Sequence, residues 1–286
     1  MRRISLLLNG SAQDRAAERA ALILATRLKA QIEGFFIRPS VAEIMARFGG
    51  SVAGSISGEI IEQILANADE FAAKAKSGFE SLARASGLAV FDKPSRAATP
   101  GVSFNVIQGP ALEALEEATE LSDLVIFGEP DRLSGSLIGD IEYTMLTLRR
   151  TVLVARGEIK DSFAERVAVA FSGRHESCTA LMRALPILQA AKSVEIIHIR
   201  EHDDEKASPA LRALRYLGQN GVAASSLEAK LSGAEVGEQI VDLAKKNDAS
   251  LVVMGGYGRS RMRELILGGT TRHLMHNSPL PVLFAH

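Results

Sequence analysis

The residues of this chain whose types and spacing could do chemistry are concentrated in residues 250–286. An apolar run, 251–254, leads directly into the glycine-rich segment 255–258, and Gly268 and Gly269 follow after a basic loop. Glycines after a strand let a ligand approach the backbone closely, and amides at the start of a helix are unpaired donors with a partial positive charge. Phosphate is the natural ligand of such a segment, and the arginines of the loop could clamp it or simply be solvated. The residues alone support nucleotide binding and a plain structural turn about equally.

Other nucleotide, metal and catalytic sites find little support in the sequence. Segment 256–261 has the first two glycines of a dinucleotide fingerprint but lacks the third, and no Walker-type Gly-Lys-Ser/Thr run occurs. His273 and His276 lie three residues apart without a third ligand type, so no zinc site is expected. No motif places a general base or a catalytic triad. We therefore predict no catalytic residue and no metal ligand.

A parallel sheet is predicted to position the glycine segment. Short apolar runs bounded by turn residues alternate with helical patterns along the chain, which predicts strands covered by helices on both faces. Ser232 and Glu235 have capping-box spacing before one of the helices, and Pro186 should kink another. The predicted strands are 4–8, 34–38, 102–107, 124–127, 151–155, 166–171, 194–199, 225–229, 251–254 and 281–285, and the main predicted helices are 16–28, 59–82, 177–190 and 210–217.

The same order of elements occurs twice, which indicates two tandem domains. Segment 122–128 matches segment 249–255 with an offset of 127 residues, whereas Asn9 matches Ser172 with an offset of 163. The first repeat therefore carries about 36 extra residues, which a predicted loop over 41–58 and the long helix after it account for. We predict a first domain of residues 1–157 and a second domain of residues 158–286.

The glycine loop of the first repeat is degenerate. It reads Gly128-Glu129-Pro130-Asp131 and then Gly139-Asp140, so an aspartate replaces the second glycine and another stands at the phosphate position. Carboxylates at a phosphate site repel the ligand. The first domain is therefore predicted to bind no nucleotide and to serve as a structural partner.

Composition and charge argue against nucleic acid and membranes as partners. The chain has 286 residues and a formal net charge of -1, so neither nucleic acid nor an anionic membrane is expected as a partner. No apolar run approaches the ~18 residues of a membrane span, and the N-terminal run is too short for a secretory signal. Cys178 is the only cysteine, which excludes an intrachain disulfide, and we interpret it as a small buried residue of a helix. These features predict a cytoplasmic protein.

The glycine segment resembles a known signature. Met254-Gly255-x-x-Gly258, nine residues, Gly268 with a small residue after it, and then Pro-Val-Leu at 281–283 look like the adenine-nucleotide motif of the universal stress protein family. The resemblance extends over both repeats. It implies two tandem Rossmann-like domains of the adenine nucleotide α-hydrolase-like type, each with a five-stranded, mainly parallel sheet flanked by helices.

The resemblance also implies a ligand, ATP or AMP with or without magnesium, bound in the second domain. Glycines of the loop would approach the ribose and phosphates, the helix start would bind phosphates, and the backbone of Ile199 would meet adenine. The residues carried over are Ser172, Ile199, Met254, Gly255, Gly258, Gly268, Gly269 and Thr270.

Two departures from the family pattern weaken the expected affinity. Gly269 stands where a serine often follows the third glycine, and Ser172 stands where many nucleotide-binding members have an aspartate. Loss of one charged contact would cost about 1.5–3 kcal/mol of binding free energy. The pattern therefore supports a location for the ligand more firmly than an affinity.

Three functions remain open at this point. The leading hypothesis is a stress-response protein that binds an adenine nucleotide in its second domain and acts through conformation or partner choice. The alternatives are an interaction module that binds no nucleotide and a slow ATPase, although no residue is assigned to catalysis. The resemblance further implies that strands 151–155 and 281–285 meet across a pseudo-twofold interface, which makes one chain an intrachain pseudo-dimer and leaves homo-oligomers open.

Overall fold

A computed structural model of the chain describes residues 1–49, 57–94, 99–130, 136–200, 208–233, 235–256 and 269–286. The chain divides into two compact units, which we call the N-terminal unit (Arg2–Gly128) and the C-terminal unit (Glu129–His286). The C-terminal unit thus includes the end of the first repeat. The repeat boundary at residues 157 and 158 stays a prediction.

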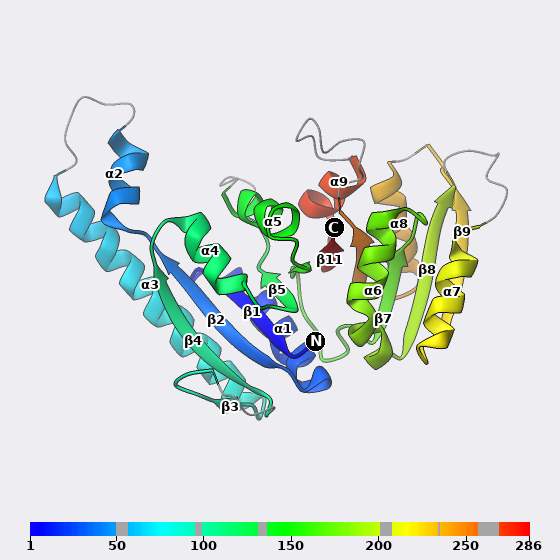
Figure 1. Cartoon of the computed structure of the whole chain (residues 1–286), viewed down its shortest axis with the longest axis horizontal. Coiled ribbons are helices and arrows are strands. Elements are labelled where there is room, and N and C mark those ends of the chain that lie inside the picture. Colours follow the sequence, from blue (N-terminus) through cyan, green and yellow to red (C-terminus); the bar gives the residue numbers. More distant parts are fainter. Residues whose placement is uncertain (50–56, 95–98, 131–135, 201–207, 234, 257–268) are drawn as a thin grey trace. The chain divides into compact units, whose positions relative to one another are not determined.

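The N-terminal unit is a parallel sheet covered by helices on both faces. Strands β1 (Arg3–Leu8), β2 (Gln31–Arg38), β3 (Ala89–Val90), β4 (Gly101–Gln108) and β5 (Leu124–Phe127) follow the order β3-β4-β2-β1-β5. Helices α1 (Asp14–Leu28) and α3 (Gly58–Ala85) cover one face and α4 (Ala111–Thr119) the other, while α2 (Val41–Gly49) precedes α3 (Figure 1). The central strands β1 and β2 bury most of their residues on both faces, and the buried residues include the polar Ser5 and Glu33.

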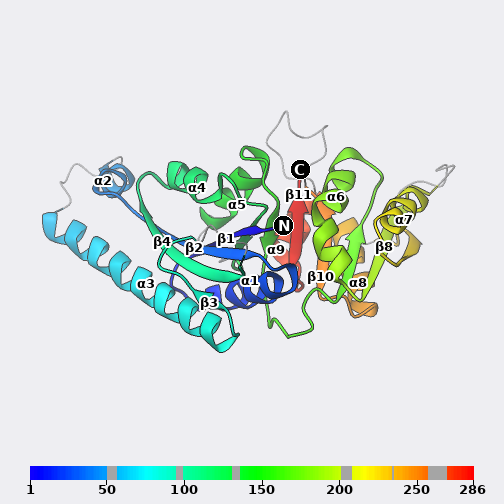
Figure 2. The ribbon, with the colours of Figure 1, turned by 60° about the horizontal axis from the view of Figure 1, so that its bottom comes forward.

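The C-terminal unit repeats this arrangement. Strands β6 (Val152–Val154), β7 (Arg166–Ala170), β8 (Ser193–Arg200), β9 (Ala224–Lys230), β10 (Leu251–Gly255) and β11 (Val282–Ala285) follow the order β6-β11-β10-β7-β8-β9. Its helices are α5 (Ser136–Leu146), α6 (His175–Ala190), α7 (Ala210–Gln219), α8 (Val236–Lys246) and α9 (Gly269–Asn277). Helices α6 and α7 cover one face of the sheet, and α8 and α9 cover the other (Figure 2). The predicted α/β fold with mainly parallel sheets is confirmed.

One pairing in the C-terminal unit is antiparallel. Strand β6 pairs with β11, so that Val154 faces Val282 and Val152 faces Phe284. All other pairs in that sheet are parallel. The final strands of the two sequence repeats therefore hydrogen-bond to each other directly.

The loop predicted over residues 41–58 is wrong for residues 41–49, which form helix α2. Ser40 and Glu43 form a capping box, since the Glu43 N–H donates to the Ser40 Oγ and the Ser40 N–H donates to the Glu43 carboxylate, each at 3.2 Å. The second Glu43 oxygen accepts from the Ala111 N–H at 2.8 Å and so caps α4 as well. The Ser-x-x-Glu spacing at Ser40 was the available signal for this helix.

The capping box expected at Ser232 and Glu235 is wrong. Glu235 is itself the N-cap residue of α8 and makes no side-chain capping bond. The Ser232 N–H instead donates to the Gln239 side chain at 3.1 Å, and the Gln239 amide donates to the Lys230 carbonyl at 2.8 Å. Gln239, in the first turn of α8, thus holds the loop before the helix, in place of the helix cap expected from Ser232.

Candidate functional site

The order of the strands creates a switch point in the C-terminal sheet. The chain leaves β7 through α6 to reach β8 on one side, whereas β10 lies on the opposite side of β7. In open α/β sheets, ligands bind beyond the carboxyl ends of the strands at such a point, because the loops on either side diverge there. The candidate site is therefore the edge formed by the ends of β7, β8 and β10 and the start of α9.

The described candidate residues of the strands share this edge. Met254 pairs in register with Ala170, and Ala170 pairs in turn with Ile197, so the strands end at similar levels. Ser172 is exposed two residues after β7, and Ile199 is a buried residue near the end of β8.

The start of α9 also lies at this edge, since α9 leads back to β11, which runs parallel to β10. Gly269 and Thr270 are the first two residues of α9. Gly258 and Gly268 lie outside the described residues.

Gly255 has a packing role of its own. A Cβ atom at this position would lie 2.5 Å from the Glu176 carbonyl carbon and 2.6 Å from the Ser177 nitrogen, at the start of α6. Gly128, its counterpart in the first repeat, is similarly close to the backbone of Gln13, at 2.9 Å. Both glycines are therefore required by close approach of a strand end to a helix start, whatever ligand is bound.

The turn after β7 is held by hydroxyl groups. The Ser172 Oγ donates to the Ser177 Oγ at 3.3 Å and accepts from the Arg174 N–H at 3.4 Å, while the Ser177 Oγ lies 2.8 Å from the Arg174 carbonyl. Gly173 has a φ of 75°, and a Cβ there would meet Pro209 at 2.6 Å. The turn thus presents a neutral, exposed hydroxyl at the position where the family pattern favours a carboxylate.

In the N-terminal unit, the equivalent turn after β1 is held by the buried carboxylate of Asp14, which was not predicted from the sequence. Asp14 accepts from the N–H groups of Asn9 and Gly10, at 3.0 and 2.7 Å. Burial raises the pKa of Asp14 to about 6, although these backbone donors act in the opposite direction. The offset of 163 residues maps Asp14 onto Ser177, and that comparison could have identified it.

Neither α9 nor α5 has an acidic residue in its first turn, and a Cβ at Gly269 or at Gly139 would meet open space. The first amides of α9 therefore keep the donor capacity and positive potential of a helix N-terminus. Asp140 is the fifth residue of α5, a position whose N–H is normally used within the helix. Asp131 lies outside the described residues.

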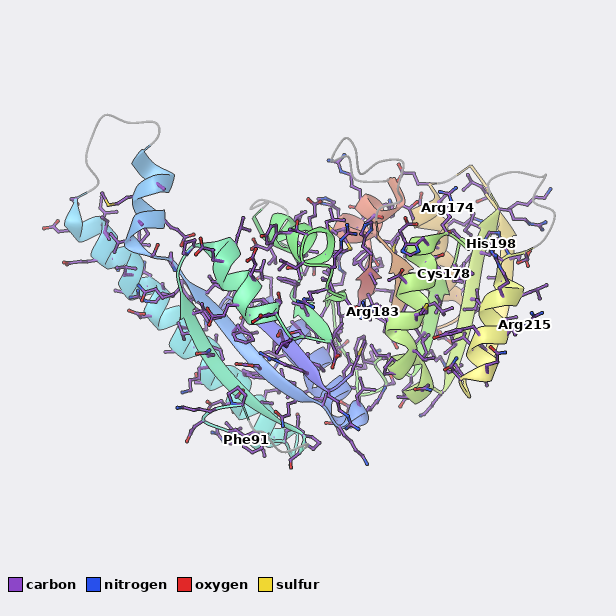
Figure 3. The ribbon with its side chains drawn as sticks, in the orientation of Figure 1. Phe91, Arg174, Cys178, Arg183, His198 and Arg215 are labelled. Atoms are coloured by element: carbon purple, nitrogen blue, oxygen red, sulfur yellow. The ribbon has the colours of Figure 1, made fainter. Side chains whose placement is uncertain are left out.

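His198 and Cys178 lie beside the site and have structural explanations. His198 is 3% exposed, and its Nδ1 lies 3.0 Å from the Phe171 carbonyl, so it joins β8 to the end of β7, as expected for a packed histidine (Figure 3). Cys178 is half-buried on α6, somewhat more exposed than the predicted core residue. Within the described ranges, no cluster of histidine, cysteine and acidic residues could hold a metal ion.

Arg156 fixes the far end of α9. It is 2% exposed, and its Nη1 and Nη2 donate to the carbonyls of Ser278 and Met275 at 2.8 and 2.7 Å. A cation at a helix C-terminus satisfies carbonyls that have no partner in the helix. Arg156 follows β6, so the first repeat supplies the residue that caps the last helix of the second repeat.

Comparison with known proteins agrees with this geometry. Residues 164–286 match the model of the universal stress protein family. A universal stress protein of Synechocystis is 25% identical over 294 aligned residues, which cover 99% of each chain. No helix in the described part of the chain is long and apolar enough to cross a membrane.

Two solved structures share the fold over nearly the full length. A universal stress protein from Archaeoglobus fulgidus has a TM-score of 0.70 at 17% identity, covering 99% of this chain and 97% of that one. A Pseudomonas aeruginosa protein of unknown function has a TM-score of 0.62 at 13% identity, with coverage of 100% and 92%. Residues 164–286 therefore match the universal stress protein family, and the whole chain shares the fold of these solved structures.

Proposed function

We propose that the C-terminal unit binds an adenine nucleotide, ATP or AMP, and that the protein acts in a stress response through nucleotide-dependent conformation or partner choice. The observation that carries the proposal is the start of α9, which is free of acidic residues and lies at the switch-point edge of the sheet. Gly269 and Thr270 offer backbone amides and a hydroxyl to phosphates there. Gly258 and Gly268, outside the described residues, complete the proposed phosphate loop.

The remaining contacts of the proposed complex come from the strand ends. The Ile199 backbone is proposed to meet adenine, and Met254 and Gly255 border the ribose. Ser172 offers one hydroxyl in place of a carboxylate, so binding is expected to be about one to two orders of magnitude weaker than with an aspartate. Magnesium would be held mainly by the nucleotide's phosphates, because the described residues of the site contribute hydroxyl and backbone groups.

We propose no nucleotide site in the first repeat. The segment of the first repeat that matches the phosphate loop carries Glu129, Asp131 and Asp140, and carboxylates repel phosphate. We propose no enzymatic turnover either, since no residue is placed as a general base by any motif. The role of the first repeat is instead to support the second, through the β6–β11 pairing and Arg156.

Acid extraction of the purified protein, followed by mass spectrometry and titration calorimetry with ATP and AMP, tests this function. We expect a copurified adenine nucleotide or a measurable affinity below millimolar. Absence of both at millimolar nucleotide would reject nucleotide binding and favour the interaction module.

A further inference from the structure

Helix α3 carries an acidic segment that extends beyond its buried part. We define the acidic segment as residues 58–71 of α3; it contains Glu59, Glu62, Asp69 and Glu70 and no lysine or arginine. Buried positions of α3 begin only at Ala68. The Nε and Nη2 of Arg38 donate to the two carboxylate oxygens of Asp69 at 2.6 and 2.8 Å, so the segment is anchored near its C-terminal end.

The acidic segment also exposes apolar side chains. Ile60 is 51% exposed and Phe71 is 47% exposed, while Val41 and Met45 of the neighbouring α2 are 43% and 55% exposed. Ile60 and Phe71 lie 11 residues (71 minus 60), or about three turns, apart and therefore on the same side of α3, where one partner surface can cover both.

Helices α6 and α7 carry the opposite charge. We define the arginine face as Arg174, which is the N-cap residue of α6, together with Arg183 of α6 and Arg212 and Arg215 of α7. All four are exposed, and Figure 3 labels Arg174, Arg183 and Arg215. The one carboxylate on these helices, Glu176, is buried. The exposed apolar residues Met182 and Leu211 lie on the same two helices, at 59% and 64% exposure.

The two surfaces match in spacing as well as in charge. Glu59 and Glu62 lie three residues apart on α3, and Arg212 and Arg215 lie three residues apart on α7, so each pair projects from one side of its helix. We propose that the acidic segment of one molecule docks on the arginine face of another molecule of the same chain. Reciprocal contacts of this kind would give a symmetric dimer.

The apolar residues favour a protein helix over nucleic acid as the occupant. A phosphate backbone would use the arginines but leave Met182 and Leu211 without a partner, whereas Ile60 and Phe71 supply one. The nearly neutral net charge also provides no broad field for attracting nucleic acid.

Charge reversal tests the proposal by sedimentation velocity over protein concentrations up to about 1 mM. The wild type should associate at low ionic strength and dissociate as salt rises to about 0.5 M. Arg183→Glu with Arg215→Glu, and separately Glu59→Arg with Glu62→Arg, should each weaken self-association at least tenfold. An equimolar mixture of the two variants should associate again, because each then meets an opposite charge.

Lys245→Glu with Lys246→Glu is the matched control, since it makes the same change in net charge at exposed residues of α8. It should associate like the wild type, and circular dichroism should show every variant folded. A wild type that stays monomeric, or a variant mixture that does not associate, would overturn the proposal. So would a monomer that binds a fluorescent oligonucleotide through Arg183 and Arg215, which would identify nucleic acid as the occupant.

Discussion

At the scale of single residues, Gly255 belongs to the glycine motif but is required for packing against the start of α6. A Cβ there would lie 2.5 Å from the backbone of Glu176, which cannot move without shifting α6. We expect Gly255→Ala to lower the free energy of unfolding by about 1–3 kcal/mol, measured by urea denaturation. Gly139→Ala is the control, because a Cβ at Gly139 meets open space, and it should leave stability unchanged or slightly raised. Equal stability of the two variants would refute the packing role.

Asp14 gives the stability of the protein a pH dependence. Its pKa is raised from 3.8 to about 6, mainly by burial, so the folded protein holds a proton that the unfolded chain releases between pH 4 and 6. This carboxyl group therefore lowers stability as pH rises through that window, by up to about 3 kcal/mol.

Asp14→Asn removes that titration while keeping an oxygen that can accept from Asn9 and Gly10. Relative to the wild type, the variant should gain about 2–3 kcal/mol of unfolding free energy between pH 4 and 7. Denaturant unfolding at a series of pH values measures this difference. A difference that does not change with pH would show that Asp14 titrates normally.

At the scale of elements, Arg156 is the clearest link between the two repeats. Arg156→Leu should lower the free energy of unfolding by about 2–3 kcal/mol, because it leaves the carbonyls of Met275 and Ser278 without their donor. Arg84→Leu is the control, since Arg84 is exposed on α3 and pairs with Glu80 on the surface, and should cost less than about 1 kcal/mol. Thermal and urea unfolding measure both, and equal losses would contradict a capping role.

Several elements were predictable because their signals are local. Apolar runs bounded by turn residues predicted the positions of β5, β7, β10 and β11, and the repeat indicated two α/β halves. Helix α2 was missed although Ser40 and Glu43 have capping-box spacing, because the glycines and serines that follow dominate the segment. The capping box predicted at Ser232 does not form, because Gln239 in the first turn of α8 bonds to Ser232 instead.

The site was predictable only in part, since its residues depend on tertiary neighbours. The position of Gly269 at the start of a helix followed from the motif. The contact of Gly255 with α6, the buried Asp14 and the capping by Arg156 all join residues distant in sequence, and no local pattern announces them.

At the scale of the whole molecule, we expect one nucleotide to bind per chain. The loop of the first repeat carries Asp131 and Asp140, whereas the second repeat has Gly258 and Gly269 in the matching segment. Calorimetric titration with ATP should therefore give a stoichiometry close to one, and not two. Two equivalent sites would show that the degenerate loop of the first repeat still binds.

The most direct measurement of the central claim compares two aspartates placed at corresponding glycines. Gly269 and Gly139 both have room for a side chain, so Gly269→Asp and Gly139→Asp should both fold, and an aspartate is favourable at the start of α9. In calorimetric titrations with ATP, Gly139→Asp should bind like the wild type, whereas Gly269→Asp should bind at least about tenfold more weakly, because its carboxylate repels the phosphates. Unchanged ATP affinity in Gly269→Asp, or a loss in Gly139→Asp alone, would contradict a nucleotide site at the start of α9.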